Sequence, residues 1–260
     1  MKAHVYSIDG EQKKQIDLPP VFDEEFRPDV IRRAFLSART ARIQGWAADK
    51  MAGKRTSALW LGKGHGASRV PRVKGSRHPT AGRGAFVPPN VGGRRAHPPK
   101  TSKIHLERIN KKERALAIRS AIAATKDEKL VKSRGHLIEK VKELPLVVSD
   151  EVEKFNKSKQ ARDTLEKIGL WQDVEKAGNS KKVRAGRGTM RGRRYRTSVG
   201  PLVVVGSDNG IVKAMRNLPG VDVVNVKNLN AELLAPGGDP ARLTLWTESA
   251  IKELEKGVFS

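Results

Sequence analysis

The sequence predicts an α/β protein in which a mostly parallel sheet lies between two layers of helices, a three-layer α/β/α arrangement. After residue 144, short apolar runs alternate with segments of helical periodicity, and the runs are apolar at successive positions. Strands with this pattern are buried on both faces, as in a parallel sheet covered by helices on both sides. Two long segments without acidic residues interrupt the alternation, and we expect them to form an extended basic loop and a second basic insert.

The N-terminal part predicts a hairpin followed by a helix. Residues 4–8 and 15–18 flank the dipeptide Asp9-Gly10, which favours a two-residue hairpin turn. Pro28 then opens a helix. The residues that share one face at helical spacing are Ile31, Phe35, Ala38 and Ala41 or Arg42.

A second helix is expected after residue 110. Asn110 and Glu113 have the spacing of a capping box, in which each side chain accepts a hydrogen bond from the backbone of the other residue. The apolar positions that follow at helical spacing are Ala115, Ile118, Ala121, Ile122 and Thr125. Because one helix precedes residues 50–106 and the other follows them, both ends of that segment are expected to be anchored on one domain.

The remaining elements alternate between strand and helix. Residues 144–148 predict a buried strand, and Ser158 is expected to cap a helix that ends at Gly169. The apolar face of that helix consists of Ala161, Leu165 and Ile168. After Gly200, strands are expected at residues 202–205, 221–226 and 243–246, and helices at residues 211–218 and 231–234. Thr247 is expected to cap a final helix with Ala250, Ile251 and Leu254 turned inward.

Residues 50–106 form the long basic segment. They contain no Asp or Glu, and their apolar residues are few and aperiodic, so the segment is expected to lack a core of its own. A flexible linker has a similar composition. Here, however, glycines occur beside basic residues, prolines occur in pairs, and Trp46, Trp60 and Phe86 could stack on bases. We expect a globular domain at 1–49 and 107–260 and an extended loop at 50–106.

A second insert is expected at about residues 176–199. No acidic residue occurs between Lys176 and Ser207, and arginines crowd around Gly186, Gly188 and Gly192. A single basic insert could be a solvated surface. Two such segments in a chain of net charge +24 and a sequence pI near 10.5 favour a polyanionic partner, above all nucleic acid.

The sequence gives little support to an enzymatic function. Gly206 and Gly210 follow the strand at 202–205 but do not match the dinucleotide fingerprint, and Gly62-Lys63-Gly64-His65 does not match a P-loop. The histidines are too irregularly spaced for a metal site, so we expect no metal, no cofactor and no catalytic residue. The alternative from another class is an RNA-modifying enzyme that holds a nucleotide on its α/β core and RNA on its basic segments.

Composition narrows the class of protein further. Cysteine is absent, which excludes disulfides, cysteine-based zinc sites and a thiol nucleophile. The first residues reach Asp9 and Glu11 without a long apolar run, so we expect neither a signal peptide nor a membrane partner. No helix-turn-helix, zinc-finger or basic-zipper pattern is present, whereas irregular arms rich in Arg, Lys and Gly suit folded RNA.

Three runs carry a resemblance to a known family. They are residues 62–72 (GKGHGASRVPR), 92–100 (GGRRAHPPK) and 184–195 (RAGRGTMRGRRY). Together they resemble the archaeal and eukaryotic type of large-subunit ribosomal protein number four, and the similarity extends over nearly the whole chain. The resemblance implies a cytoplasmic protein within the large ribosomal subunit, bound to large-subunit ribosomal RNA and next to other ribosomal proteins. It also implies that the loop lines the nascent-polypeptide exit tunnel beside ribosomal protein number twenty-two.

The resemblance assigns roles to particular positions. The residues expected to bind ribosomal RNA are Lys54, Arg55, Lys63, Arg77, Arg83, Arg94, Arg95, His97, Lys100, Arg184, Arg187, Arg191, Arg193, Arg194 and Arg196. The loop tip facing the nascent chain is expected within Gly64, His65, Gly66, Ser68, Arg69, Val70, Pro71, Arg72 and Lys74. Arg69 and Arg72 are expected nearest the tunnel wall. His65 stands where many relatives are expected to have arginine, so this position lacks a permanent charge.

Overall fold

The computed structural model describes residues 1–259, and the chain divides into two compact units. Unit 1 comprises Met1–Ala41 and the chain from Glu107 onward, and unit 2 comprises Arg42–Leu106. The first division falls at the end of helix α1 (Pro28–Ala41). The sequence predicts that the loop starts later, at residue 50.

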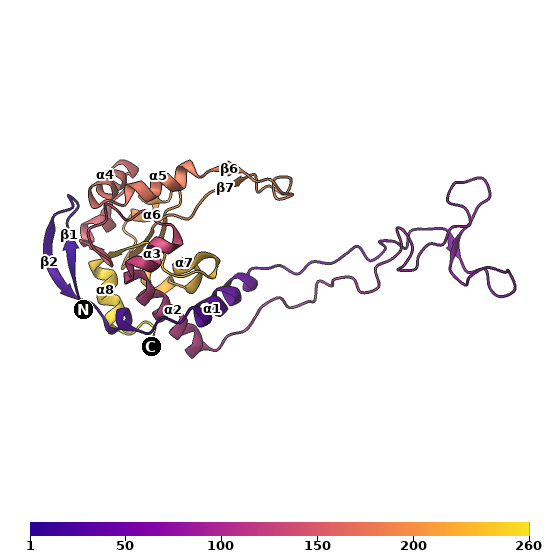
Figure 1. Ribbon diagram of the computed structural model, residues 1–260, viewed down its shortest axis with the longest axis horizontal. Coiled ribbons are helices and arrows are strands. Elements are labelled where there is room, and N and C mark those ends of the chain that lie inside the picture. The colour runs from indigo at the N-terminus through magenta and orange to yellow at the C-terminus, as the bar shows by residue number, and fades with distance from the viewer. Residues whose placement is uncertain (260) are drawn as a thin grey trace. The chain divides into compact units, whose positions relative to one another are not determined.

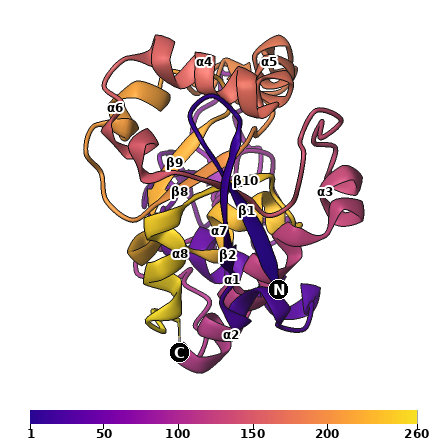
Figure 2. The same cartoon turned by 90° about the vertical axis from the view of Figure 1, so that its left-hand side faces the viewer.

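Unit 1 is built on a six-stranded sheet of order β2-β1-β5-β10-β8-β9 (Figures 1 and 2). The strands are β1 (Lys2–Tyr6), β2 (Gln12–Asp17), β5 (Leu146–Val148), β8 (Leu202–Val205), β9 (Asp222–Asn225) and β10 (Thr244–Thr247). Only the β1–β2 pair is antiparallel, and the other neighbours are parallel. The predicted mostly parallel α/β fold is therefore confirmed, and the N-terminal hairpin supplies one edge of the sheet.

Helices cover both faces of the sheet, as Figure 2 shows for α4, α5 and α6 on one side and α2 and α8 on the other. The α-helices are α1 (Pro28–Ala41), α2 (Lys111–Ala123), α3 (Glu128–Arg134), α4 (Ser158–Ile168), α5 (Trp171–Asn179), α6 (Ile211–Met215), α7 (Ala231–Leu234) and α8 (Glu248–Glu255). The 3-10 helices are Pro20–Asp23, Ala124–Lys126, Asp150–Lys154, Val226–Asn228 and Pro236–Gly238. In the part of the chain that the structure describes, no helix has both the length and the apolar composition needed to cross a membrane.

The strands alternate between two apolar layers. In β5, Leu146 and Val148 pack with α3, α4, α5 and α6, whereas Val147 faces the layer that contains α1, α2, α7 and α8. Trp246 of β10 is fully buried in that second layer and meets Phe22 edge to face, with ring centroids 5.5 Å apart. Both faces of the central strands are therefore buried, as the uninterrupted apolar runs predict.

Several details differ from the sequence predictions. Asn110 lies at the N-cap of α2, but its side chain makes no capping hydrogen bond, so the predicted capping box is wrong. Glu113 instead pairs with Arg33 of α1 at 2.7 Å. Ser158 is the first residue of α4 rather than its cap, whereas Thr247 caps α8 as predicted and accepts a hydrogen bond from the Ala250 backbone N–H.

The sequence predictions omit two helices, α3 and α5, and misplace some element boundaries. α3 is mostly charged and buries little besides Val131, so its apolar periodicity is weak. α5 begins at Trp171, two residues after the glycine that ends α4, and extends to Asn179, which makes the first residues of the predicted insert helical. β5 starts at Leu146, two positions after the predicted start, because Pro145 has no N–H to donate. α6 ends at Met215 rather than at residue 218.

Candidate nucleic-acid interface

Unit 2 is organised around a short antiparallel pair, β3 (Ala58–Leu59) and β4 (Arg72–Val73). Residues 60–71 connect these strands and contain most of the predicted tip. An isolated bridge between Arg72 and Gly84 then closes a second loop, and Figure 1 shows both loops leaving the strand pair. The unit therefore has defined local structure, although Pro71 is the one buried residue among residues 42–106.

Arg72 holds the two loops of unit 2 together. Its guanidinium donates hydrogen bonds to the carbonyl oxygen of Gly82 at 2.9 Å and to the hydroxyl of Ser68 at 3.1 Å. The side chain of Arg69, in contrast, is exposed, as is that of His65. Of the two arginines expected nearest the tunnel wall, Arg69 is thus the one presented to solvent, while Arg72 positions its neighbours.

Unit 2 has two limbs, the outgoing chain before β3 and the returning chain after the second loop. They approach each other closely where residues 92–100 begin. A Cβ atom on Gly53 would lie 2.5 Å from the backbone of Gly93, and a Cβ atom on Gly93 would lie 2.0 Å from the carbonyl oxygen of Val87. Atoms cannot approach so closely, so a larger residue at position 53 would push the limbs apart, and one at position 93 would distort the turn between Val87 and Gly93. The Arg94 backbone N–H also donates to the carbonyl oxygen of Phe86 at 3.1 Å.

The predicted RNA-binding side chains of unit 2 are mostly exposed. The exposed ones are Lys54, Arg55, Lys63, Arg77, Arg83, Arg95, His97 and Lys100. Arg94 is half-buried, and Arg55 forms an ion pair with Asp49. Asp49 is the single acidic residue of the unit, so the other predicted RNA-binding side chains of unit 2 have no carboxylate of their own unit to pair with.

The second insert forms a hairpin in unit 1, with β6 (Lys182–Val183) antiparallel to β7 (Tyr195–Arg196). The ring of Tyr195 organises its base, because the Lys181 ammonium lies 4.6 Å and the Arg194 guanidinium 5.8 Å from the ring centroid. Arg184 donates from Nε to the carbonyl oxygen of Tyr195 at 3.0 Å. The predicted RNA-binding arginines of this insert are all exposed, and they are Arg184, Arg187, Arg191, Arg193, Arg194 and Arg196.

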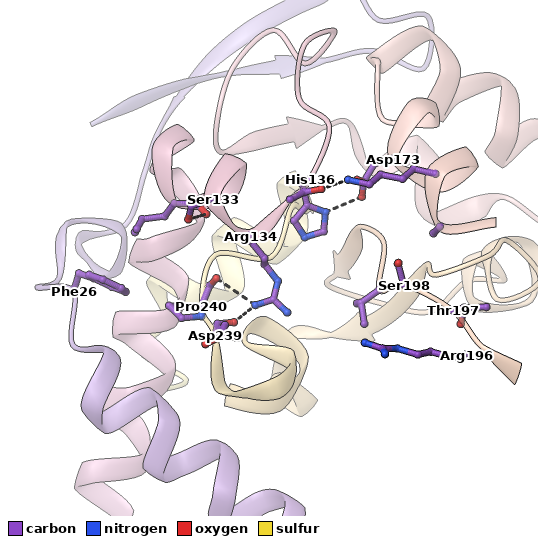
Figure 3. Close-up of a pocket in the computed structure, with 15 residues that line it drawn as sticks. Phe26, Ser133, Arg134, His136, Asp173, Arg196, Thr197, Ser198, Asp239 and Pro240 are labelled. Atoms are coloured by element: carbon purple, nitrogen blue, oxygen red, sulfur yellow. Dashed lines mark hydrogen bonds and ion pairs between the residues drawn. The ribbon is translucent and has the colours of Figure 1, made fainter. Parts of the chain in front are cut away.

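A polar pocket adjoins the end of this insert (Figure 3). On one side, His136 Nδ1 meets the Asp173 carboxylate at 2.8 Å in a buried pair. On another side, Arg134 donates to the backbone carbonyls of Pro236, Asp239 and Pro240. Burial lowers the pKa of Arg134, as does the nearby charge of Arg242. Arg196 lines the same pocket and contributes an exposed cation to its edge. Nothing in the spacing of His136 and Asp173 predicts their pairing.

The carboxylate of Glu153 lies at the carboxyl ends of the parallel strands. Glu153 accepts hydrogen bonds from the Gly206 backbone N–H at 2.9 Å, the Ser207 hydroxyl and the Thr247 hydroxyl, both at 2.8 Å, and the Ser249 hydroxyl at 2.5 Å. Burial acts to raise the pKa of Glu153, but these hydrogen bonds outweigh it and hold the pKa below its ordinary value. Nucleotides bind at this edge in doubly wound sheets. Here its donors already serve an anion, which argues against the alternative of a nucleotide-dependent enzyme.

Among residues 1–259, no group of three His, Asp or Glu side chains lies close enough to hold a metal ion. The site that stands out is therefore the set of exposed cations on unit 2 and on the β6–β7 hairpin.

Comparisons with known proteins agree over most of the chain. Residues 16–257 match the model of the ribosomal protein L4/L1 family. A large ribosomal subunit protein uL4 from Methanosphaera stadtmanae is 52% identical, over 97% of this chain and 96% of its own length. The proteins of the same name from Methanocaldococcus jannaschii and Methanococcus aeolicus are 54% and 51% identical, each over 98% of this chain and 99% of its own length.

Proposed function

The chain belongs to the ribosomal protein L4/L1 family, and from that membership we propose that it is a structural constituent of the large ribosomal subunit in the cytoplasm. The relatives are named as proteins of that subunit, and the similarity covers nearly the whole of each chain. This supports a role in assembly and architecture rather than in catalysis. The Glu153 carboxylate at the strand ends supports the same choice, because it takes the donors that a nucleotide phosphate would need.

The proposed ligand is large-subunit ribosomal RNA. The observation that carries this proposal is the separation of charge: residues 50–106 and 176–199 contain no acidic residue, and nearly all of their predicted RNA-binding side chains are exposed. Arginine and lysine side chains without local carboxylates repel one another, and phosphates relieve that repulsion. Packed RNA offers phosphates on several sides, which suits limbs that have little core of their own.

The proposed role of the tip, residues 64–74, is to line the nascent-polypeptide exit tunnel beside ribosomal protein number twenty-two. Support comes from the resemblance of residues 62–72 to the family and from the exposure of the loop that carries them. Arg72 braces that loop against Gly82, which gives the exposed Arg69 a defined place. The nascent polypeptide is thus a passing partner, and neighbouring ribosomal proteins are permanent ones.

The RNA interface is tested by the salt dependence of binding. We expect Arg94→Ala with Arg95→Ala to weaken binding to purified large-subunit ribosomal RNA and to flatten the plot of log affinity against log salt by about 0.7 to 0.9 unit for each phosphate that the variant no longer neutralises. The matched control, Arg27→Ala with Arg33→Ala, removes the same charge from side chains that pair with Asp29 and Glu113 in unit 1. An unchanged slope in the first variant would show that Arg94 and Arg95 are not part of the RNA interface.

The tip is tested by deletion. Removing residues 67–74 is expected to leave incorporation into the large subunit nearly intact, because the limbs and unit 1 carry most of the predicted phosphate contacts. Passage of nascent chains, or sensitivity to antibiotics that bind in the tunnel, is expected to change. Loss of incorporation after this small deletion would contradict the division into gripping limbs and a tunnel-facing tip.

A further inference from the structure

Two aromatic side chains from opposite ends of unit 2 stack on each other. Trp46 and His105 lie with their ring centroids 4.5 Å apart and their planes 11° from parallel. Nearby, a Cβ atom on Gly45 would lie 2.4 Å from the carbonyl oxygen of Thr101, so the two limbs are also close at the backbone. The imidazole therefore supports one face of the indole and fixes its orientation.

The indole of Trp46 is nevertheless 55% exposed, and it lines a pocket of about 720 Å³. His105 is not among the residues that line this pocket, so the imidazole leaves the indole surface that bounds the pocket uncovered. The other side chains around it include Arg95, His97, Pro98, Lys100 and Lys103. Its lining contains an aromatic face, prolines and cations, and no carboxylate.

This combination matches one chemical class of ligand. An aromatic face beside cations suits a nucleotide, because the base stacks on the ring while the phosphate meets ammonium or guanidinium groups. A pocket of this size is within the range that accepts a small organic ligand. Phosphate alone would need only the cations, and a base inside a duplex would have no free face to offer the indole.

We propose that Trp46 is the stacking platform for one unpaired RNA nucleotide, whose base lies on the free face of the indole and whose phosphate meets Arg95, Lys100 or Lys103. The proposal rests on the proposed RNA-binding function and adds to it a site that selects an unpaired base. His105 acts as a positioning residue that holds the indole from behind. Attraction between phosphates and cations draws RNA to unit 2, and the pocket accepts a nucleotide whose base is unpaired.

Trp60 provides an internal control. It belongs to the same unit and is 68% exposed, yet it does not line this pocket, and within residues 1–259 no aromatic ring stacks on it. If exposure and positive charge were sufficient for stacking, Trp60 would behave as Trp46 does.

The test uses the full chain with one indole of unit 2 at a time as a fluorescent reporter. The first protein carries Trp60→Phe and Trp171→Phe, and the second carries Trp46→Phe and Trp171→Phe. The remaining Trp246 is fully buried in both. The probes are a single-stranded oligouridylate and inorganic polyphosphate, which share charge but differ in having bases. We expect the oligouridylate to quench most of the Trp46 emission and little of the Trp60 emission, and polyphosphate to quench neither.

A second measurement uses affinity at high salt, where phosphate contacts contribute less. We expect Trp46→Leu to weaken oligouridylate binding about tenfold, Trp46→Phe to recover part of that loss, and Trp60→Leu to match the unaltered chain. Equal quenching of both reporters, or an unchanged affinity for Trp46→Leu, would overturn the proposal while leaving RNA binding intact. Absence of any binding to ribosomal RNA by the unaltered chain would instead contradict the proposed function itself.

Discussion

Unit 1 and unit 2 differ in how they use charge. In unit 1 carboxylates lie beside cations, as in the pairs Lys126–Asp23, Lys14–Glu248 and Lys167–Asp9, at 2.7, 2.8 and 2.6 Å. Unit 2 has one acidic residue, Asp49, and one buried residue, Pro71. The first unit pairs many of its cations with its own carboxylates and buries an apolar core on both faces of a sheet. The second has one carboxylate and one buried residue, and the proposed RNA partner would supply the negative charge that it lacks.

Arg242 of unit 1 is a buried cation, in contrast to the mostly exposed cations of unit 2. Its side chain is only 1% exposed, and it donates to the carbonyl oxygens of Gly200 and Leu233 and to the Asp222 carboxylate, the last at 2.6 Å. Burial lowers the pKa of Arg242, and the charge of Asp222 opposes that effect. A buried arginine is tolerated because every part of its guanidinium has an acceptor. Several arginines of unit 2, among them Arg69, Arg83 and Arg95, are exposed instead.

The largest effect is expected from the core of unit 1. Trp246→Ala removes a fully buried side chain that packs against Phe22, and we expect the free energy of unfolding to fall by about 4 kcal/mol. Urea unfolding followed by circular dichroism measures this. Trp60→Ala, at an exposed position of unit 2, is the control and is expected to change it by less than about 0.5 kcal/mol. Similar losses in both variants would break the comparison between the units.

The next effect is expected at the strand ends. Glu153→Ala leaves the donors of Gly206, Ser207, Thr247 and Ser249 without their common acceptor, and we expect a loss of about 3 kcal/mol in the free energy of unfolding. Glu153→Gln keeps one acceptor oxygen and is expected to lose less. If both variants unfold like the unaltered chain, the carboxylate is dispensable and the edge of the sheet is free for another ligand.

The same carboxylate predicts a smaller effect of pH. Because the pKa of Glu153 is held below its ordinary value of 4.5 in the folded state, its contribution to stability is fully present above pH 4.5. That contribution is lost as the pH falls through the folded-state pKa. We expect Glu153→Gln to flatten the decline of unfolding free energy as the pH falls below 4.5. Parallel curves for the two proteins would show that the carboxylate is not the group responsible.

The smallest effect on global stability is expected in unit 2. Arg72→Ala removes the hydrogen bonds to Ser68 and Gly82, yet we expect the unfolding free energy to change by less than about 0.5 kcal/mol. Backbone amides of residues 68–84 are expected to exchange faster with solvent, because the loops lose their brace. Arg69→Ala, whose side chain is exposed, is the matched control and should leave exchange unchanged. Equal amide exchange in the two variants would show that Arg72 does not brace the loops.

The sequence predicts some parts of this molecule well and others poorly, for physical reasons. β8 is found at the predicted residues because four successive apolar positions require burial on both faces. α3 is missing from the prediction because it is mostly charged and depends on tertiary packing of Val131. Acid-free composition locates the basic segments, since charge is read directly from residue types. The Trp46–His105 stack and the His136–Asp173 pair depend on contacts between distant positions, and no local pattern contains them.

The strand order also has a consequence for biosynthesis. β10 lies in the middle of the sheet, between β5 and β8, although it is the last strand of the chain to be made. The sheet of unit 1 therefore cannot close until Thr247 has been synthesised, and β5 and β8 must wait without their common neighbour. Both acid-free segments are complete before that moment. A newly made chain thus exposes its acid-free segments before the domain that carries them has folded. Under the proposed function, RNA contact could therefore precede the completion of the sheet.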